Sequence, residues 1–170
     1  PLALCPRPPV QGSPMSAPYF SHIGVCVRDC AASLRFYCEG LGFREVGALE
    51  VEGAPSDTLL ELEGVKLRAV YLERDGQRLE LLDFRAPGSV GAGEPREMNR
   101  RGLTHLSFRV SDADAVALKL AELGGRILEA TRTRAPDFDA VALFVLDPDG
   151  TRIELVQQPG DPRALPGGAG

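Results

Sequence analysis

Apolar and polar positions in the first half of the chain follow the order strand, helix, strand, strand, strand. Residues 21–27 form an apolar, β-branched run, and residues 30–40 carry apolar positions at helical spacing after Asp29, a natural N-cap. Further strand-forming segments occupy residues 44–51, 65–74 and 77–85. The dipeptide Asp75-Gly76 between the last two segments is a strong hairpin signal, so these two strands are predicted to pair.

The second half of the chain repeats this order. Residues 102–110 are predicted to form a strand, and Ser111 is predicted to cap a helix that ends near Leu123, before two glycines. Three more strand patterns occupy residues 126–130, 140–147 and 151–157. The tripeptide Pro148-Asp149-Gly150 suits a tight turn between the last two strands. The chain therefore contains two βαβββ units.

Each βαβββ unit alone would leave one face of its sheet uncovered. Pairing two units closes such faces, so the repeat predicts an α+β fold in which two βαβββ modules form a cupped mixed β-sheet. We expect a single domain over residues 19–158. Its modules are predicted at residues 19–85 and 102–158, joined by a Gly- and Pro-containing linker at residues 86–101.

The two ends of the chain differ in composition from this domain. Residues 1–18 and residues 159–170 are rich in proline, glycine and other small residues, so both segments are predicted to be disordered. Met15 lies within the first segment and is a candidate for the natural start of the protein.

Composition and charge exclude some classes of partner. The 170 residues carry a net charge of -5, with no excess of lysine and arginine to bind nucleic-acid phosphates or anionic lipid. No apolar run approaches the roughly 20 residues that cross a bilayer, and the proline-rich start does not resemble a signal peptide. We therefore expect a cytoplasmic protein with no nucleic-acid or membrane partner. The four cysteines form no CxxC pair and are expected to be free thiols.

Two histidines and two glutamates occupy equivalent places in the two units. The chain has only two histidines, His22 in SHIGVCV and His105 in THLSFRV, and each lies at the first strand of its unit. Glu80 in RLELLDF and Glu154 in RIELVQ each lie in the last strand. Side chains alternate along a strand, and the purely apolar face must be the one that the helix covers. The histidines are therefore expected on the opposite, concave face.

Turn geometry places the glutamates beside aromatic residues. A two-residue turn at Asp75-Gly76 sets Tyr71 opposite Glu80, and a three-residue turn in the second hairpin sets Phe144 opposite Glu154. Each glutamate is thus expected in the cup with an aromatic neighbour.

Two neutral imidazoles and two carboxylates can bind a divalent ion and balance its charge. This mixture of nitrogen and oxygen ligands suits Zn, Ni, Co, Fe or Mn rather than Ca. An octahedral ion with four protein ligands keeps two positions for water or substrate, which is typical of a catalytic site. The sequence therefore predicts one divalent metal ion held by His22, Glu80, His105 and Glu154.

Four segments together resemble a known superfamily. HIGVCVRDCAASLRFYCEGLGF, RLELLDF, GLTHLSFRVSD and DPDGTRIELVQ are similar to the vicinal oxygen chelate proteins, which include glyoxalase I, bleomycin resistance proteins and extradiol dioxygenases. The resemblance implies that the two histidines and two glutamates match the family's four metal-binding positions, where vicinal oxygens of a substrate displace water. It also implies a homodimer, whose cups are closed either within one chain or between chains.

The same resemblance implies a proton transfer on a small substrate, of the glyoxalase or epimerase kind, by a lyase or isomerase. Glu154, or Glu80, would act as the general base. Glutathione-dependent members carry an arginine where Cys26 stands, and the asparagine after their first glutamate is absent from ELLDFRAPG, so glutathione is not indicated. Two alternatives stay open: an Fe(II) ring-cleaving dioxygenase, and a metal-free drug-binding protein of the bleomycin-resistance kind.

Four further residues are predicted to line the substrate pocket. Cys26 and Arg109 share the strand faces of the two histidines, whereas Tyr71 and Phe144 are the cross-strand neighbours of the glutamates. Arg109 would suit an anionic substrate, unless it is simply solvated at the end of the sheet. Cys26 is expected to pack rather than to act as a nucleophile.

Overall fold

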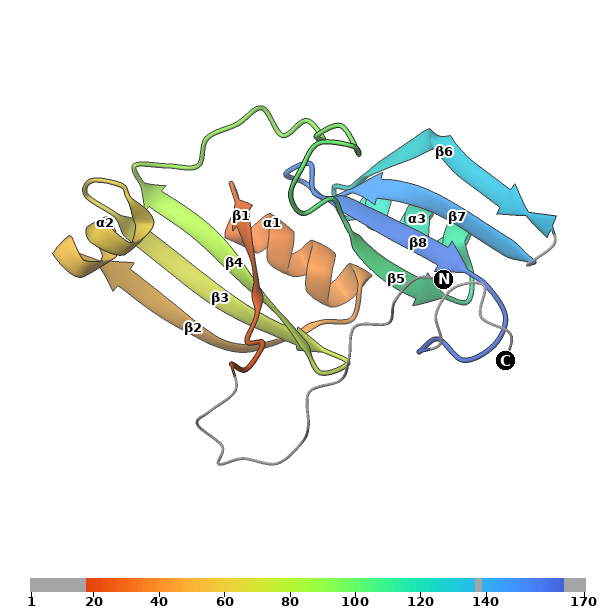
Figure 1. Cartoon of the computed structure of the whole chain (residues 1–170), viewed down its shortest axis with the longest axis horizontal. Coiled ribbons are helices and arrows are strands. Elements are labelled where there is room, and N and C mark those ends of the chain that lie inside the picture. Colours follow the sequence, from red (N-terminus) through yellow and green to blue (C-terminus); the bar gives the residue numbers. More distant parts are fainter. Residues whose placement is uncertain (1–17, 137–138, 164–170) are drawn as a thin grey trace, which may run out of the picture.

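The computed structural model describes residues 18–136 and 139–163 of the chain. Of the two segments predicted to be disordered, residues 1–17 and 164–170 lie outside the described residues. In the described part the chain forms two four-stranded mixed sheets with few helices, as Figure 1 shows, and this confirms the predicted fold class.

The first module contains one strand, a helix and then three strands. Its elements are β1 (Ile23–Val27), α1 (Cys30–Leu34), the π-helical turn η1 (Arg35–Gly40), β2 (Arg44–Glu52), α2 (Ala54–Leu60), β3 (Lys66–Arg74) and β4 (Gln77–Ala86). The second module repeats the order with β5 (Leu106–Val110), α3 (Ala113–Glu122), β6 (Arg126–Ala135), β7 (Ala140–Leu146) and β8 (Arg152–Gln157). The strand orders, β1-β4-β3-β2 and β5-β8-β7-β6, are equivalent, and in each sheet the first strand runs parallel to the last.

Helix caps explain where the helices begin. The Asp29 carboxylate accepts hydrogen bonds from the amides of Ala31 and Ala32, as predicted. In the second module the cap is Asp112, whose carboxylate accepts from the Ala115 amide 2.9 Å away, so the prediction of Ser111 was wrong by one residue. A carboxylate accepts the free amides of a helix start and also interacts favourably with its positive end.

The short helix α2 was not predicted. It follows Gly53, whose φ of 91° a glycine adopts without strain, and it ends before a loop fixed by Asp57. The Asp57 carboxylate accepts from the amides of Gly64 and Val65, which closes the connection into β3.

Both hairpins have the register that their turns predicted. Tyr71 lies opposite Glu80 across β3 and β4, and Phe144 lies opposite Glu154 across β7 and β8. The apolar side chains of β1, Val25 and Val27, are buried in the common core, which leaves the other face of that strand free for the site.

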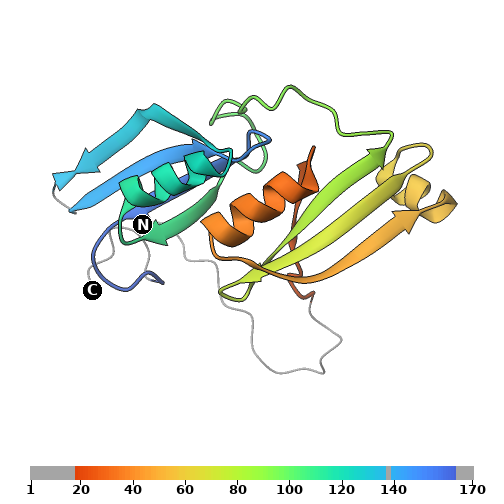
Figure 2. The same cartoon turned by 180° about the vertical axis from the view of Figure 1, so that it is seen from behind.

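The helices pack on one side of the molecule and join the modules. Figure 2 shows α1 and α3 together on the side away from the view of Figure 1. Phe36 of η1 and Leu120 of α3 are fully buried at this contact. A Cβ on Gly125 would lie 2.8 Å from a Phe36 ring atom and 2.9 Å from the Leu146 carbonyl oxygen, so only glycine permits this close approach.

A buried hydrogen bond also joins the modules. The Tyr37 hydroxyl of η1 donates to the Asp147 carboxylate across 2.8 Å, and both side chains are almost fully buried. The other oxygen of Asp147 accepts from the amides of Asp149 and Thr151. One carboxylate therefore shapes the β7–β8 turn and ties it to the first module.

Replacing Tyr37 with phenylalanine is expected to lower the free energy of unfolding by about 1–3 kcal/mol at neutral pH, because the buried carboxylate loses a donor. Burial raises the pKa of the Asp147 carboxyl, and the Tyr37 hydroxyl opposes that rise. Because the folded-state pKa lies above the unfolded value, the stability contributed by this group is complete at low pH and is lost as the pH rises through the folded-state pKa. The cost of Tyr37→Phe should therefore shrink in acid, where the carboxyl is protonated. Denaturant unfolding of the wild type and of Tyr37→Phe at a series of pH values measures this difference in the free energy of unfolding.

The matched control is Asp147→Asn, which is neutral at every pH. In that background the cost of Tyr37→Phe should not vary with pH. A cost that is equally pH-independent in the wild-type background would contradict this role for Asp147.

None of the helices in the described part of the chain is both long and apolar enough to span a membrane.

Candidate metal site

The first module brings one predicted histidine and one predicted glutamate together. His22 lies just before β1, and its Nε2 atom is 3.1 Å from Oε2 of Glu80 on β4. The Ser21 hydroxyl lies 3.0 Å from Nδ1 of His22. Tyr71 donates from its hydroxyl to Oε1 of Glu80 across 2.6 Å, and its ring packs edge-on against the imidazole. The hydrogen bond to Glu80, followed by burial, raises the pKa of the Tyr71 hydroxyl.

The second module repeats this arrangement. Nε2 of His105 is 3.5 Å from Oε2 of Glu154 on β8, and the Thr104 hydroxyl lies 2.9 Å from Nδ1 of the imidazole. The Phe144 ring packs edge-on against His105, as Tyr71 packs against His22. Here the hydroxyl donor to the carboxylate is Ser107, which lies 2.6 Å from Oε2 of Glu154.

The donor atoms of each pair suit a divalent metal ion. A hydroxyl beside Nδ1 can accept from the Nδ1–H tautomer, and in that tautomer the Nε2 lone pair is available to a metal ion. All four side chains are only partly exposed, with exposed fractions of 34% for His22, 15% for Glu80, 28% for His105 and 26% for Glu154. Each module therefore presents one nitrogen and one carboxylate oxygen that face each other at a partly buried position.

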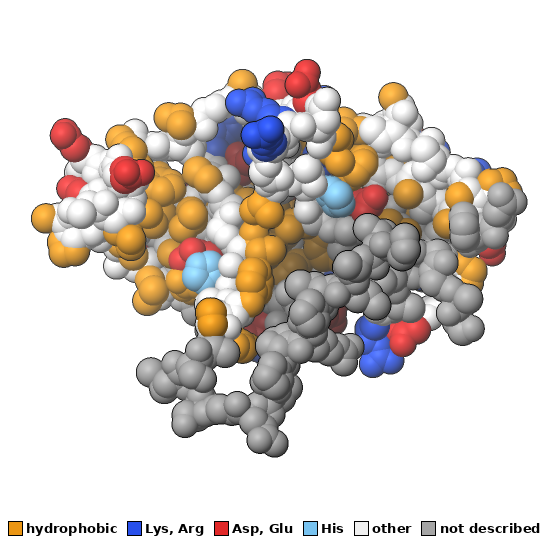
Figure 3. Space-filling model, in the orientation of Figure 1, with side chains coloured by type: hydrophobic (Ala, Val, Ile, Leu, Met, Phe, Trp, Pro, Cys, Tyr) orange, Lys and Arg blue, Asp and Glu red, His pale blue; other side chains and the backbone are white. Residues whose placement is uncertain are grey.

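The two pairs are separate within one chain. Figure 3 shows the two imidazoles, in pale blue, as distinct patches on one side of the molecule with apolar side chains between them. In residues 18–136 and 139–163, no three or more His, Cys, Asp or Glu side chains gather closely enough to hold a metal ion. The described part of one chain thus holds two separate His–Glu pairs, each called a half site below, rather than one cluster of four side chains.

The residues predicted to line a pocket have different surroundings. Tyr71 and Phe144 lie against the imidazoles, as described above. Cys26 is a free cysteine on an exposed residue. Partial burial of its sulfur, followed by the nearby carboxylates of Asp149 and Asp83, raises the pKa of the thiol. A thiol with a raised pKa is protonated at neutral pH and is a poor nucleophile. Arg109 donates to the carbonyl oxygens of Gln158 and Pro159 and so holds the segment after β8.

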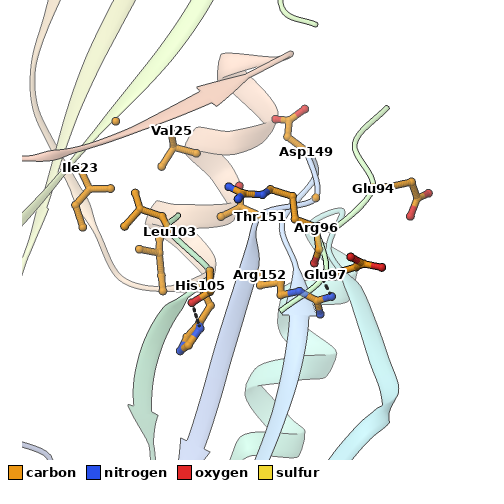
Figure 4. Close-up of a pocket in the computed structure, with 14 residues that line it drawn as sticks. Ile23, Val25, Glu94, Arg96, Glu97, Leu103, His105, Asp149, Thr151 and Arg152 are labelled. Atoms are coloured by element: carbon orange, nitrogen blue, oxygen red, sulfur yellow. Dashed lines mark hydrogen bonds between the residues drawn. The ribbon is translucent and has the colours of Figure 1, made fainter. Parts of the chain in front are cut away.

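A cavity of about 280 Å³ lies between the modules and reaches one half site. In Figure 4, Ile23, Val25 and Leu103 form its apolar side, and charged side chains including Arg96, Glu97 and Arg152 face them. His105 belongs to its lining, whereas neither glutamate of the two pairs does. The linker therefore contributes charged residues next to the second half site.

The hydroxyls that surround the two pairs were not predicted from the sequence. Ser21 and Thr104 directly precede the two histidines, so a repeated Ser/Thr-His dipeptide could have indicated them. Ser107 is the cross-strand neighbour of Glu154 and could have been found from the parallel pairing of the outer strands.

The fold and this constellation define a class of protein. Residues 19–155 match the Glyoxalase/Bleomycin resistance protein/Dioxygenase superfamily, and the chain belongs to it. Among curated proteins, the chain is 30% identical over 139 residues to the uncharacterized protein YaeR of Escherichia coli (strain K12). That match covers 81% of this chain and 94% of YaeR.

Solved structures share the fold at lower identity. The glyoxalase family protein of Bacillus cereus superposes with a TM-score of 0.72 at 17% identity, covering 88% of this chain and all 100% of that chain. The trypanothione-dependent glyoxalase I of Leishmania major superposes with a TM-score of 0.57 at 22% identity, covering 83% of this chain and 87% of that one. Members of the superfamily commonly use a divalent metal ion, act on small molecules and form dimers.

Proposed function

We propose that this protein is a divalent-metal-dependent enzyme that catalyses a glyoxalase- or epimerase-like proton transfer on a small substrate with two vicinal oxygens. The observation that carries the proposal is the pair of equivalent half sites. Each aligns an imidazole Nε2 with a carboxylate oxygen, and each imidazole has a hydroxyl at Nδ1. The metal would be Zn, Ni, Co, Fe or Mn, because the ligand set mixes nitrogen and oxygen.

The complete site would require two copies of the chain. Half sites that lie apart in one chain give four ligands only when the first module of one protomer faces the second module of its partner. A twofold axis repeats this contact, so a homodimer would contain two equivalent sites of His22, Glu80, His105 and Glu154. Exposed strands support such a partner: nearly every residue of β2 is exposed, and Leu49 on it is 54% exposed.

In this proposal the protein's own residues bind, orient and move a proton. A bound ion would polarise a carbonyl oxygen of the substrate and so acidify the adjacent C–H bond. His22, His105 and Glu80 would fix the geometry. Glu154 would take the proton from carbon and return it to the same or the neighbouring carbon, as a general base and then a general acid. Tyr71, Phe144 and the apolar side chains around the half sites would limit access of water.

Metal loading tests the first part of the proposal. The purified protein should contain about one Ni, Co, Zn, Mn or Fe ion per chain, as expected for two shared sites in a dimer. Adding the metal at about 100 times its Kd to the chelator-treated protein should raise the free energy of unfolding by about 2.7 kcal/mol. Elemental analysis and thermal unfolding are the measurements. Absence of metal together with no stabilisation by any of the five ions would overturn the proposal in favour of a metal-free binding protein.

Activity assays separate the two enzymatic alternatives. The loaded protein would be tested with a thiohemiacetal of an α-ketoaldehyde, with an α-branched acyl thioester in D2O and with a catechol in air. Proton transfer predicts isomerisation of the first or exchange of the α-hydrogen of the second. Ring cleavage of the catechol by the Fe(II) form alone would instead establish the dioxygenase.

A further inference from the structure

The two carboxylates of the half sites have different hydrogen-bond partners although their strands are equivalent. Each glutamate has two cross-strand neighbours: Glu80 lies between Gly24 and Tyr71, and Glu154 lies between Ser107 and Phe144. One neighbour of each glutamate carries a hydroxyl, but the two hydroxyls lie on non-equivalent strands of the two modules. For Glu80 the hydroxyl comes from β3, and for Glu154 it comes from β5.

These hydroxyls contact different oxygens relative to the imidazole. Tyr71 donates to Oε1 of Glu80, whereas Oε2 is the oxygen that faces His22. Ser107 donates to Oε2 of Glu154, which is the same oxygen that faces His105. The Tyr71 bond therefore orients Glu80 and leaves the oxygen next to the imidazole available. The Ser107 bond uses a lone pair of the oxygen that an ion beside His105 would bind.

We propose that Tyr71 is a positioning residue that holds Glu80 in its ligating orientation, and that Ser107 competes with the ion for the near oxygen of Glu154, so that the first half site contributes more of the metal affinity than the second. This inference rests on the proposed metal site and assigns different roles to its two acidic ligands. Other observations agree with it. The His105–Glu154 separation of 3.5 Å exceeds the 3.1 Å of His22–Glu80, and Glu154 is 26% exposed against 15% for Glu80.

The two hydrogen bonds affect the binding of a cation in opposite ways. A donor on the far oxygen holds the carboxylate in its ligating rotamer, so less side-chain freedom is lost on binding. A donor on the near oxygen places a partly positive hydrogen next to the cation, so it competes with the ion for that oxygen.

The repeat supplies matched variants for the test. Tyr71→Phe removes the far-oxygen donor, and Phe144→Tyr introduces the same phenol beside Glu154. Ser107→Ala removes the near-oxygen donor. Gly24→Ser introduces it beside Glu80, where a Cβ would lie 3.9 Å from Oε2 and 3.3 Å from a methyl carbon of Leu82. Leu82 Cδ1 is the end of a flexible side chain and can move aside.

Co(II) affinity of the full chain, measured by competition with a chromogenic chelator, is the readout. The visible absorption of the bound Co(II) reports its coordination. Tyr71→Phe should weaken binding about tenfold or more, and Gly24→Ser should also weaken it, whereas Ser107→Ala should bind at least as tightly as wild type. Phe144→Tyr should tighten binding and alter the Co(II) spectrum, because the added phenol would hold Glu154 in its ligating orientation.

The outcomes separate this inference from the proposed function. A wild-type protein that binds no Co(II) would overturn the proposed metal site itself. A wild type that binds Co(II) while Tyr71→Phe matches its affinity, or while Ser107→Ala loses as much affinity as Tyr71→Phe, would overturn only the division of roles. If Tyr71→Phe does not fold by circular dichroism, the comparison of Ser107→Ala, Phe144→Tyr and wild type decides, because these two substitutions retain the Tyr71 bond.

Discussion

A mixture of two metal-free double variants is expected to recover bound metal. His22→Ala/Glu80→Ala removes the first half site, and His105→Ala/Glu154→Ala removes the second, so each homodimer lacks a half of both sites. In a mixed dimer, the intact second module of the first variant would face the intact first module of the other. Random pairing should restore about a quarter of the wild-type metal, because half of the dimers are mixed and each carries one intact site of two. Elemental analysis after co-expression measures this recovery.

The matched control is a mixture in which both partners lack the ligands of the same module. Two differently tagged copies of His22→Ala/Glu80→Ala, co-expressed in the same way, place both substitutions in the first module of every chain, so no pairing offers more than the two ligands of the second module. No metal should be recovered there. If the wild type binds metal but neither mixture does, the four ligands meet within one chain, and the homodimeric site is wrong.

Replacing Glu154 with glutamine is expected to reduce turnover by about 10²–10⁴-fold, because an amide cannot accept the proton from carbon. The fold should be retained, since Glu154 is partly exposed on the open face of β8 and glutamine has nearly the same shape. The measurement is the rate of hydrogen–deuterium exchange at the substrate carbon in D2O, on the substrate from the assay panel that the wild type turns over, at saturating metal.

Glu80→Gln is the matched comparison in the other module. It should mainly weaken metal binding, so that added metal restores part of the rate, whereas added metal should not restore Glu154→Gln. Full activity of Glu154→Gln would remove this residue from the role of general base. A rate loss in Glu80→Gln that saturating metal leaves unchanged would instead favour Glu80 as the base.

These experiments also bear on the two alternatives to proton transfer. A ring-cleaving dioxygenase needs two histidines and one carboxylate, so it gives no role to the fourth ligand. A metal-free binding protein needs none of the four. Two histidines that each have a hydroxyl at Nδ1, and two glutamates that each have a hydroxyl donor, support a site with four ligands.

Short-range patterns were sufficient to predict much of the local structure. Asp75-Gly76 sets the register of β3 and β4 because a two-residue turn permits one pairing, and Tyr71 is found opposite Glu80 as predicted. The burial of Val25 and Val27 follows from strand alternation in the same way. The predicted start of a helix was less accurate where two neighbouring residues can both serve as the N-cap. Ser111 and Asp112 are such a pair, and Asp112 is the cap that the structure shows.

The sequence by itself determined the four candidate ligands, the strands that carry them and the superfamily, because turn type, alternation and an internal repeat act over short distances. Only the tertiary structure decided how the modules sit relative to each other. The Tyr37–Asp147 hydrogen bond joins residues 110 positions apart, and η1 contacts α3 from a distant part of the chain. No local pattern specifies such contacts. That packing separates His22 and Glu80 from His105 and Glu154, because the helices rather than the open sheet faces meet at the module interface.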